Sequence, residues 1–418
     1  MIRLPVIIRY YLLYFLMIDF ISGFTRVYLG IISPLANIGY WVRGPLLLLF
    51  IFYYVYQLYL KKLYLDETLC IILFIYLVIN IIINYSPNFS HRIITDDFPY
   101  ILRFQFLLFL FVYMKNRMKI DKDLVSKIIK NNFFIFTISL LLGYIFNFGM
   151  QSYRLEGTSK GMFQGGNDVS ILNLIFFTYF ILNGKFRRYF IPSIFTIFNG
   201  YIIASKSIVG FIIPLFFALK KNILQINKFI FITVLCLVIG ISLEIIIDST
   251  VKQYEKRFGL NIKKSLSAAE KVGGLYNNKT MNRVASINFR RYASLNAQMS
   301  ESLSSLRNFL FGFSHSGQVI FWEKRGEFTF PNASMDFFDF FFKYGLIGIV
   351  ILSIILLKDF KNIIKKCSTR DFFIILFFFG YAFFGGHVIA STTSGTLFYF
   401  YNAYVSKRNV FHSENIKL

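Results

Sequence analysis

The sequence has few of the residues that usually build metal or nucleotide sites. It contains only three cysteines and four histidines among 418 residues. Cys70, Cys236 and Cys367 are scattered, so neither a disulfide framework nor a zinc-ligand spacing is present. Paired histidines, acidic DxD-type pairs in the expected outer loops, and the glycine patterns of Walker and dinucleotide-binding loops are also absent. We therefore expect a protein that works without a metal ion or cofactor.

Charged residues are scarce as well, and acidic ones especially so. They make up 16% of the chain, with 21 Asp and Glu against 45 Lys and Arg, whereas 56% of the residues are hydrophobic. A soluble chain of this length cannot bury so much apolar surface in one or two cores. A lipid bilayer removes that limit because it solvates the outer faces of helices. The net charge of +24 falls in clusters between apolar runs, which indicates topology signals rather than nucleic-acid binding.

Apolar runs long enough to cross a hydrocarbon core of about 30 Å predict an all-α polytopic bundle of about twelve transmembrane helices. The runs fall at 4–24, 41–60, 68–85, 99–114, 131–149, 168–184, 188–204, 207–219, 228–248, 336–357, 371–386 and 388–406. The first run lacks a small-residue cleavage site, so we expect a retained helix rather than a signal peptide. No internal repeat and no matched pair of interrupted helices, which are frequent in transporters, is visible.

The distribution of Lys and Arg predicts the orientation. With both termini in the cytoplasm, every inside loop is rich in these residues: 61–67, 115–130, 184–188, 220–228 and 358–371. The short outside loops hold only Arg26, Arg43, Arg92, Arg154 and Lys160. Short cytoplasmic loops carry the excess of positive charge in membrane proteins, so this asymmetry predicts cytoplasmic N- and C-termini.

Residues 249–335 form one long polar stretch between the ninth and tenth runs. It holds about thirteen Lys or Arg against roughly five Glu, and long loops cross the membrane regardless of charge. Near-helical spacing of apolar residues from 290 to 310 predicts a partly helical external region. The expected organisation is therefore transmembrane helices in 1–248, a large basic external loop in 249–335, and transmembrane helices with a cytoplasmic tail in 336–418.

Charge at a membrane edge is costly, so each such residue is a functional candidate. In this topology the candidates all lie at the outer face: Arg154, Glu156, Asp168, Lys206, Arg290, Arg291, Asp336 and Asp339. Arg154 opens a glycine-rich segment ending at Asn167, which is either an anion-binding segment or an ordinary polar turn. Lys206 lies between two serines, where snorkelling to water is the simpler explanation. Arg290 and Arg291 suit a phosphate, although a solvated face would carry the same pair.

Asp336 and Asp339 begin the tenth run three residues apart, hence on one face of a helix. The helix dipole alone explains carboxylates there, but either one could also take a proton from a hydroxyl group as a general base. His315 lies in a Gly-Ser turn of the basic loop and is the alternative base.

Several of these residues lie in short motifs that follow one another along the chain. The motifs are Arg154 with Asn167, Ser205-Lys-Ser207, Arg290-Arg291 before Asn308-Phe-Leu-Phe-Gly-Phe-Ser, and Asp336-Phe-Phe-Asp339 before Lys-Tyr-Gly-Leu-Ile-Gly348. Their order resembles the O-antigen polymerase and ligase superfamily of C-type membrane glycosyltransferases, over roughly residues 130–350. The Tyr-Gly-Leu-Ile-Gly motif, with an acidic residue shortly before it, is most similar to the polymerase (Wzy) branch.

The resemblance implies a bacterial inner-membrane enzyme that joins oligosaccharide repeat units carried on undecaprenyl pyrophosphate. The lipid pyrophosphate is the leaving group, and no cofactor or metal is required. The residues implied to hold pyrophosphate or glycan are Arg154, Asn167, Lys206, Arg290, Arg291, His315 and Asp339, with Asp336 as the base and the arginine pair beside it. A co-polymerase that regulates chain length is the implied protein partner, and nucleic acid is not a partner.

Two alternatives stay open. An O-antigen ligase would carry a His near the position of Ser334, which argues against that branch. A flippase for the same lipid-linked glycan would place cations along a central cavity and would lack the large external loop.

Overall fold

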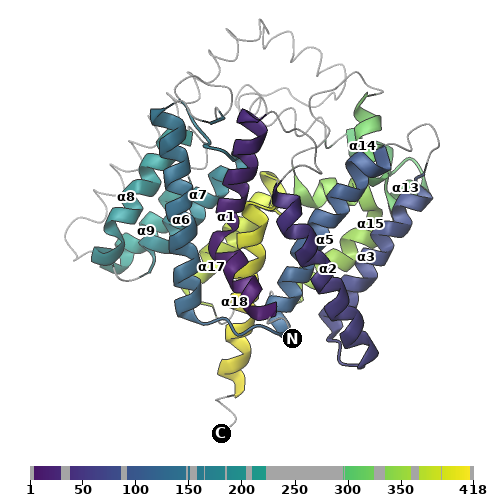
Figure 1. Ribbon diagram of the computed structural model, residues 1–418, viewed down its shortest axis with the longest axis horizontal. Helices are drawn as coiled ribbons and strands as arrows, with labels where there is room; N and C mark the ends of the chain where they lie inside the picture. Colours follow the sequence, from purple (N-terminus) through teal and green to yellow (C-terminus); the bar gives the residue numbers. More distant parts are fainter. Residues whose placement is uncertain are drawn as a thin grey trace, which may run out of the picture.

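The computed structural model describes residues 4–29, 38–85, 92–146, 149–150, 158–163, 165–183, 186–203, 210–222, 295, 297–323, 335–358, 367–386 and 388–414. Within these ranges the chain forms helices and connecting turns, with no strand. The start of α1 and the end of α18 lie at the same end of the bundle (Figure 1). The all-α prediction is therefore confirmed for the described residues.

Six helices are long and apolar enough to cross a membrane, as expected of a helical membrane protein. They are α1 (Leu4–Tyr28), α2 (Ile38–Tyr59), α3 (Leu65–Ile83), α5 (Phe98–Asn116, extended by the π-helical turn η3, Ile93–Asp97), α6 (Lys122–Ile145) and α15 (Asp336–Leu357). The other helices are α7 (Gly166–Ile181), α8 (Phe186–Ile203), α9 (Ile212–Asn222), α13 (Leu306–Phe311), α14 (Ser314–Glu323), α17 (Thr369–Phe384) and α18 (Ser394–Glu414). The total of about twelve spans stays a prediction.

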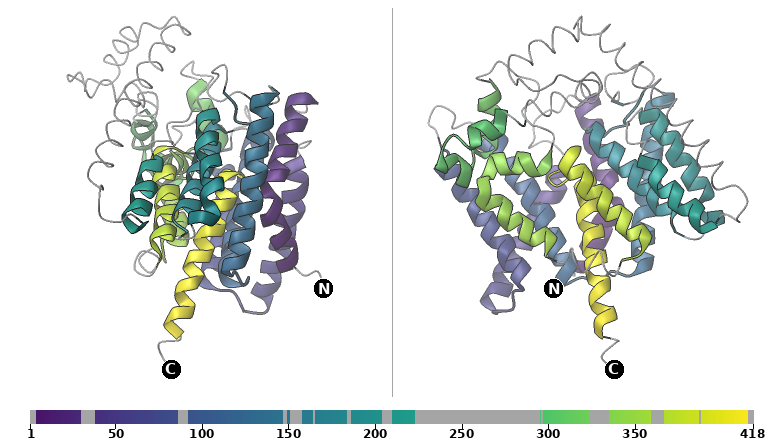
Figure 2. Two further views of the ribbon diagram at one scale, coloured as in Figure 1. Left: turned by 90° about the vertical axis from the view of Figure 1, so that its left-hand side faces the viewer. Right: turned by 180° about the vertical axis from the view of Figure 1, so that it is seen from behind.

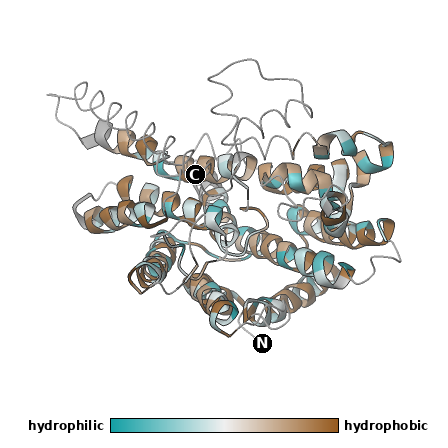
Figure 3. Ribbon diagram, turned by 90° about the horizontal axis from the view of Figure 1, so that it is seen from above, coloured by the Kyte–Doolittle hydropathy of each residue, from teal (hydrophilic) through white to brown (hydrophobic). Residues whose placement is uncertain are grey.

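Helices α5 and α7 form the centre of the bundle. Nearly every residue from 104 to 114 and from 168 to 181 is buried, since α5 packs against α2, α3 and α18, and α7 packs against α8, α9 and α17. A helix that is apolar all round belongs in such a position. The outer helices instead expose large apolar side chains, for example Trp41 and Phe52, each 70% exposed. Apolar residues predominate on the helices in Figure 3, as expected of faces solvated by lipid.

Helix α1 is interrupted at Tyr14, whose backbone angles are not helical (φ −131°, ψ 18°). The side chain of Asn132 in α6 binds both sides of the break. It accepts a hydrogen bond from the Leu16 N–H (3.2 Å) and donates one to the Leu12 carbonyl (2.9 Å). A helix break at membrane depth is tolerated where a neighbouring helix satisfies the freed backbone groups.

Helix α15 is interrupted at Gly345, where φ is +63°. A Cβ atom there would lie 2.2 Å from the Leu310 carbonyl oxygen, so only glycine fits. Gly312 (φ +70°) approaches the same turn, and the freed Tyr344 carbonyl accepts a hydrogen bond from the Tyr76 hydroxyl (2.6 Å). The two parts of α15 run in different directions (Figure 2, right). The sequence did not reveal either interruption.

The boundaries of α15 coincide with the predicted run, whereas α18 begins at Ser394 rather than at 388 because residues 388–393 form a loop. Part of the predicted external loop is helical: α13 and α14 pack against α15. The predicted run at 228–248 lies outside the described residues.

Candidate functional site

A pocket with a volume of about 340 Å³ lies where several helices meet. Its walls come from the second half of α1, the first turns of α2, α5, α7 and α15, helix α14, and the loop 388–393. Its charged and titratable lining residues are Asp19, Arg26, Tyr40, Arg43, Tyr100, Arg103, Asp168, His315, Asp336, Asp339 and Lys343. We call it the polar pocket. Its four carboxylates equal its four permanent cations in number, so the pairing of these groups decides what it can bind.

Asp336 opens α15 and reaches the loop that leads into α18. Its Oδ2 atom accepts hydrogen bonds from the backbone N–H groups of Val388 (2.5 Å) and Ile389 (2.8 Å). Asp336 also lies in the first turn of α15, where the helix dipole interacts favourably with an acidic side chain. Asp336 therefore anchors the loop as well as lining the pocket.

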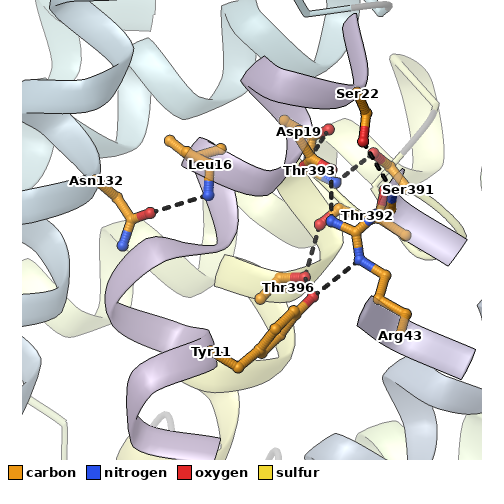
Figure 4. A network of polar contacts seen from close by, with 11 residues as sticks. Tyr11, Leu16, Asp19, Ser22, Arg43, Asn132, Ser391, Thr392, Thr393 and Thr396 are labelled. Carbon is orange, nitrogen blue, oxygen red and sulfur yellow. Dashed lines mark hydrogen bonds and ion pairs between the residues drawn. The ribbon is translucent and has the colours of Figure 1, made fainter. Parts of the chain in front are cut away.

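Asp19 in α1 binds the same loop and also pairs with Arg43 in α2. The Thr393 hydroxyl donates to Asp19 Oδ2 (2.9 Å), and Arg43 Nη2 contacts Asp19 Oδ1. The Arg43 Nε–H donates to the Tyr11 hydroxyl (3.2 Å), which lies 3.2 Å from the Thr396 hydroxyl of α18 (Figure 4). This network joins α1, α2 and α18 at the base of the loop.

Asp168 at the start of α7 is a third carboxylate on this segment. The Ser394 hydroxyl, at the first residue of α18, donates to Asp168 Oδ1 (2.6 Å). Three carboxylates from three helices thus hold residues 388–394 by their backbone N–H and hydroxyl groups. The arrangement presents Ser391, Thr392 and Thr393 to the pocket.

Asp339 also lines the pocket but binds different groups. Its Oδ1 atom accepts a hydrogen bond from Gln318 Nε2 of α14 (3.1 Å), and its Oδ2 atom accepts one from the Met335 N–H (3.2 Å). The two carboxylates predicted on one face of the helix are therefore divided between the α18 loop and α14. Asp339 is the one that connects α14 to the pocket.

His315 begins α14 and lies against Tyr100 of α5, with 4.6 Å between ring centroids. Asp97 fixes its backbone, because Asp97 Oδ1 accepts the N–H groups of His315 (2.8 Å) and Ser316 (2.9 Å). Burial and the nearby Lys343 and Arg103 lower the pKa of His315 well below its usual range. Its Nδ1 atom has no hydrogen-bond partner among the described residues. At neutral pH the imidazole is therefore uncharged.

The polar pocket contains three of the residues predicted from the sequence as site residues: Asp336, Asp339 and His315. Asn167 does not line it; its side-chain Nδ2 donates to the Gly385 carbonyl (2.9 Å) and so connects α7 to the end of α17. The four predicted cations lie outside the described residues: Arg154, Lys206, Arg290 and Arg291.

Sequence reasoning missed Asp19, Arg43, Arg103 and Lys343 as members of the site. Asp19, Arg103 and Lys343 lie inside the predicted apolar runs, whereas Arg43 lies near the outer edge of its run and is counted among the charges of the outside loops. The cost of intramembrane charge, applied along each whole run instead of only at its ends, identifies them. Asp97 precedes a run, and nothing in the sequence indicated that its partner is a backbone segment near residue 315.

Within the described ranges, no group of three His, Cys, Asp or Glu side chains is placed to hold a metal ion. The chain matches no protein-family model. No curated protein and no solved structure matches it either, so the residues of the polar pocket are the basis for a functional assignment.

Proposed function

We propose that this chain polymerises lipid-linked oligosaccharide repeat units, as its resemblance to the O-antigen polymerases implies. A hydroxyl of the acceptor sugar attacks the anomeric carbon of the donor glycan. The bond from that carbon to the pyrophosphate oxygen breaks, the lipid pyrophosphate leaves, and the hydroxyl proton passes to a base. The work of the protein is then to orient the two glycans, stabilise the departing charge and accept the proton.

The observation that supports this proposal best is the convergence of Asp336, Asp339 and His315 on one pocket. Asp336 and Asp339 share one face of α15, whereas His315 comes from a separate segment of the chain. The pocket also offers hydroxyl groups of Ser391, Thr392 and Tyr40, together with aromatic rings. Hydroxyls, carboxylates and rings are the groups that orient sugars, and cations at the same place suit a pyrophosphate.

Asp336 is the proposed base, and the structure suggests how to isolate that role. Its Oδ2 atom holds two N–H groups of the loop, and asparagine would still supply a carbonyl oxygen to them. An Asp336→Asn change therefore removes the base while keeping the anchor. His315, whose Nδ1 lacks a described partner, is the group that takes over if Asp336 proves dispensable.

The proposal also includes the location of the enzyme and its orientation in the membrane. The enzyme lies in the bacterial inner membrane with cytoplasmic termini and with the polar pocket facing outward, as the Lys and Arg asymmetry predicts. It acts on undecaprenyl-pyrophosphate-linked glycans without a cofactor, beside a co-polymerase that sets chain length.

Deletion of the gene in its native host tests the proposal, with the surface glycan separated on a gel. A polymerase deletion leaves a surface core capped with single repeat units. A ligase deletion leaves the bare core, and a flippase deletion leaves precursor inside the cell. Either of the last two patterns would refute the proposal.

A flippase for the same lipid is the second candidate, and one observation favours it. Both α1 and α15 are interrupted, and both contribute residues to the polar pocket. Discontinuous helices around a central site are typical of secondary transporters. Purified protein in liposomes with lipid-linked repeat units separates the two: a polymerase lengthens glycans, and a flippase moves them across the bilayer unchanged.

A further inference from the structure

Lys343 is a buried cation that lines the polar pocket. The residue is 2% exposed, and its ammonium forms no ion pair or hydrogen bond with the part of the chain that the structure describes. The ammonium lies over the ring of Tyr100, whose centroid is 4.1 Å from Nζ. Asp339, one turn earlier on α15, binds Gln318 and Met335 as described above.

Arg103 lies against the same ring. Its guanidinium carbon is 5.6 Å from the Tyr100 centroid, and its Nε atom is buried with no described hydrogen-bond partner. Like Lys343, Arg103 forms no ion pair with a described residue. Tyr100 thus contacts two cations that form no ion pair with a described residue, beside the imidazole of His315.

A cation–π contact offsets only part of the cost of withdrawing an ammonium group from water. Proteins rarely leave a buried charge in that condition unless a ligand completes its surroundings. The interruption at Gly345 comes directly after Lys343 and Tyr344, and it fixes the position of this part of α15 against α13. The fold therefore holds the ammonium in the pocket without supplying a described partner for it.

We propose that Lys343 and Arg103 form a phosphate-binding site beside the Tyr100 ring. A phosphate or pyrophosphate carries more than one negative charge, which matches two cations, whereas a sugar carboxylate carries only one. The planar guanidinium binds two phosphate oxygens at once, and the ammonium adds a point charge. The argument for the site stands on burial and charge; its identification with the pyrophosphate of a lipid-linked donor rests on the proposed function.

The test is the affinity of purified full-length protein for inorganic pyrophosphate, measured by calorimetry. Lys343→Met should weaken binding by about 10- to 100-fold, because a hydrogen bond to a charged group is lost. Lys343→Arg should retain most of the affinity. Lys358→Met is the matched control, since it removes the same charge just beyond the other end of α15, where Lys358 pairs with Asp66 (3.0 Å). It should bind pyrophosphate as the wild type does.

The melting temperature is a second measurement, and it distinguishes a ligand-binding role of Lys343 from a structural one. Removal of an uncompensated buried charge should raise the melting temperature of ligand-free Lys343→Met, whereas loss of a structural lysine would lower it. If Lys343→Met cannot be purified, Arg103→Gln provides the same test and should also bind about 10-fold or more weakly. Unchanged pyrophosphate affinity in the purified variant would refute the proposed phosphate-binding site.

Glucuronate serves as the carboxylate probe, and tighter Lys343-dependent binding of glucuronate than of pyrophosphate overturns the assignment to phosphate. Lys343-dependent pyrophosphate binding by a protein that does not lengthen glycans would keep the site and refute the polymerase proposal.

Discussion

The two ends of the bundle use charge in opposite ways. At the end where α3 and α17 begin and α5 and α15 finish, the buried carboxylates Asp66, Glu67 and Asp371 each pair with a cation. Asp66 binds Lys115 (2.5 Å) and Lys358 (3.0 Å), Glu67 binds Arg117 (2.8 Å), and Asp371 binds Arg370 (2.9 Å). We call these residues the paired end.

At the polar pocket the carboxylates mainly bind neutral donors. Asp336 binds backbone N–H groups, Asp168 binds a serine hydroxyl, and Asp19 divides its two oxygens between Thr393 and Arg43. Among the pocket's cations, only Arg43 forms an ion pair with a described residue. Hydroxyl, amide and backbone N–H groups therefore contribute more to positioning the carboxylates at this end than they do at the paired end.

This difference indicates which end contributes to the stability of the fold and which end is suited to a function. A buried pair contributes little to stability overall, but removal of one member leaves an uncompensated charge and is costly. Buried charges without counter-ions contribute nothing to the fold and mark functional sites in membranes. Substitutions at the paired end should thus reduce stability, and those in the polar pocket should reduce function.

The largest expected effect is on glycan lengthening by Asp336→Asn. Loss of a general base typically lowers a rate by about 10²- to 10⁴-fold, and the asparagine oxygen can still hold the N–H groups of Val388 and Ile389. The rate with lipid-linked repeat units and purified protein should fall accordingly, while the melting temperature stays near that of the wild type.

Two variants control this experiment. Asp336→Ala leaves two buried N–H groups without acceptors, at about 1–3 kcal/mol each, and should lower the melting temperature as well as the rate. Asp66→Asn at the paired end should lower the melting temperature and leave the rate per folded molecule unchanged. A normal rate in Asp336→Asn would move the base elsewhere, with His315 as the first replacement.

The next largest effect is on stability, at the break in α15. Gly345→Ala places a methyl group against the Leu310 carbonyl at φ +63° and should destabilise the protein by about 2–4 kcal/mol. Gly380→Ala in α17 is the matched control, because no atom lies within 4 Å of the added Cβ. It should be neutral or stabilise by up to about 1 kcal/mol. Equal melting temperatures for the two variants would contradict the interlocked turn.

The helices of this protein were easier to predict than its site. The run at 336–357 gave both boundaries of α15, because a long apolar segment flanked by charge has few other structures in a membrane. Lys343 was not recognised within this run, because one charged residue hardly changes the hydropathy of a long apolar segment. The loop at 388–393 was predicted as helix because its contacts with Asp19 and Asp336 are not visible in a local pattern.

Partners distant in the sequence account for the rest of the difference. The motifs around Gly312 and Gly345 were recognised separately, and only the structure shows that they pack against each other. Nothing in the type of Tyr14 marks the interruption of α1, which depends on Asn132 in another helix. Local sequence patterns therefore predict the membrane spans, whereas the site depends on contacts between different spans.

A smaller effect is expected at the paired end from Glu67→Gln. Glu67 is fully buried and binds Arg117 through both carboxylate oxygens, at 2.8 Å each, although the arginine side chain remains 19% exposed. Loss of this pair should cost about 1–3 kcal/mol, less than for a pair closed to solvent. The melting temperature should fall while pyrophosphate binding and the rate per folded molecule stay unchanged. A change in either functional measurement would remove the proposed division between the ends.

The smallest expected effect is a pH dependence of stability that belongs to the polar pocket. Burial, Lys343 and Arg103 lower the pKa of His315 in the folded protein, whereas in the unfolded chain the imidazole titrates near its usual 6.5. As the pH falls through that value, the unfolded state binds a proton that the folded state does not. Stability from this residue is therefore present above about pH 6.5 and lost progressively below it.

Melting temperatures of the wild type and His315→Gln between pH 8 and pH 5 test this expectation. Other groups that titrate, including Asp97 beneath the His315 backbone, contribute to both proteins, so the difference between the two curves isolates His315. The wild type should lose more stability on acidification than the variant. Glu67→Gln should keep the wild-type slope at a lower melting temperature, because its lost pair lies at the other end of the bundle. Parallel curves for the wild type and His315→Gln would show that His315 is as easily protonated in the folded protein as in the unfolded one. The imidazole would then not lie beside two cations that form no ion pair with a described residue, and the contrast between the two ends would lose one of its supports.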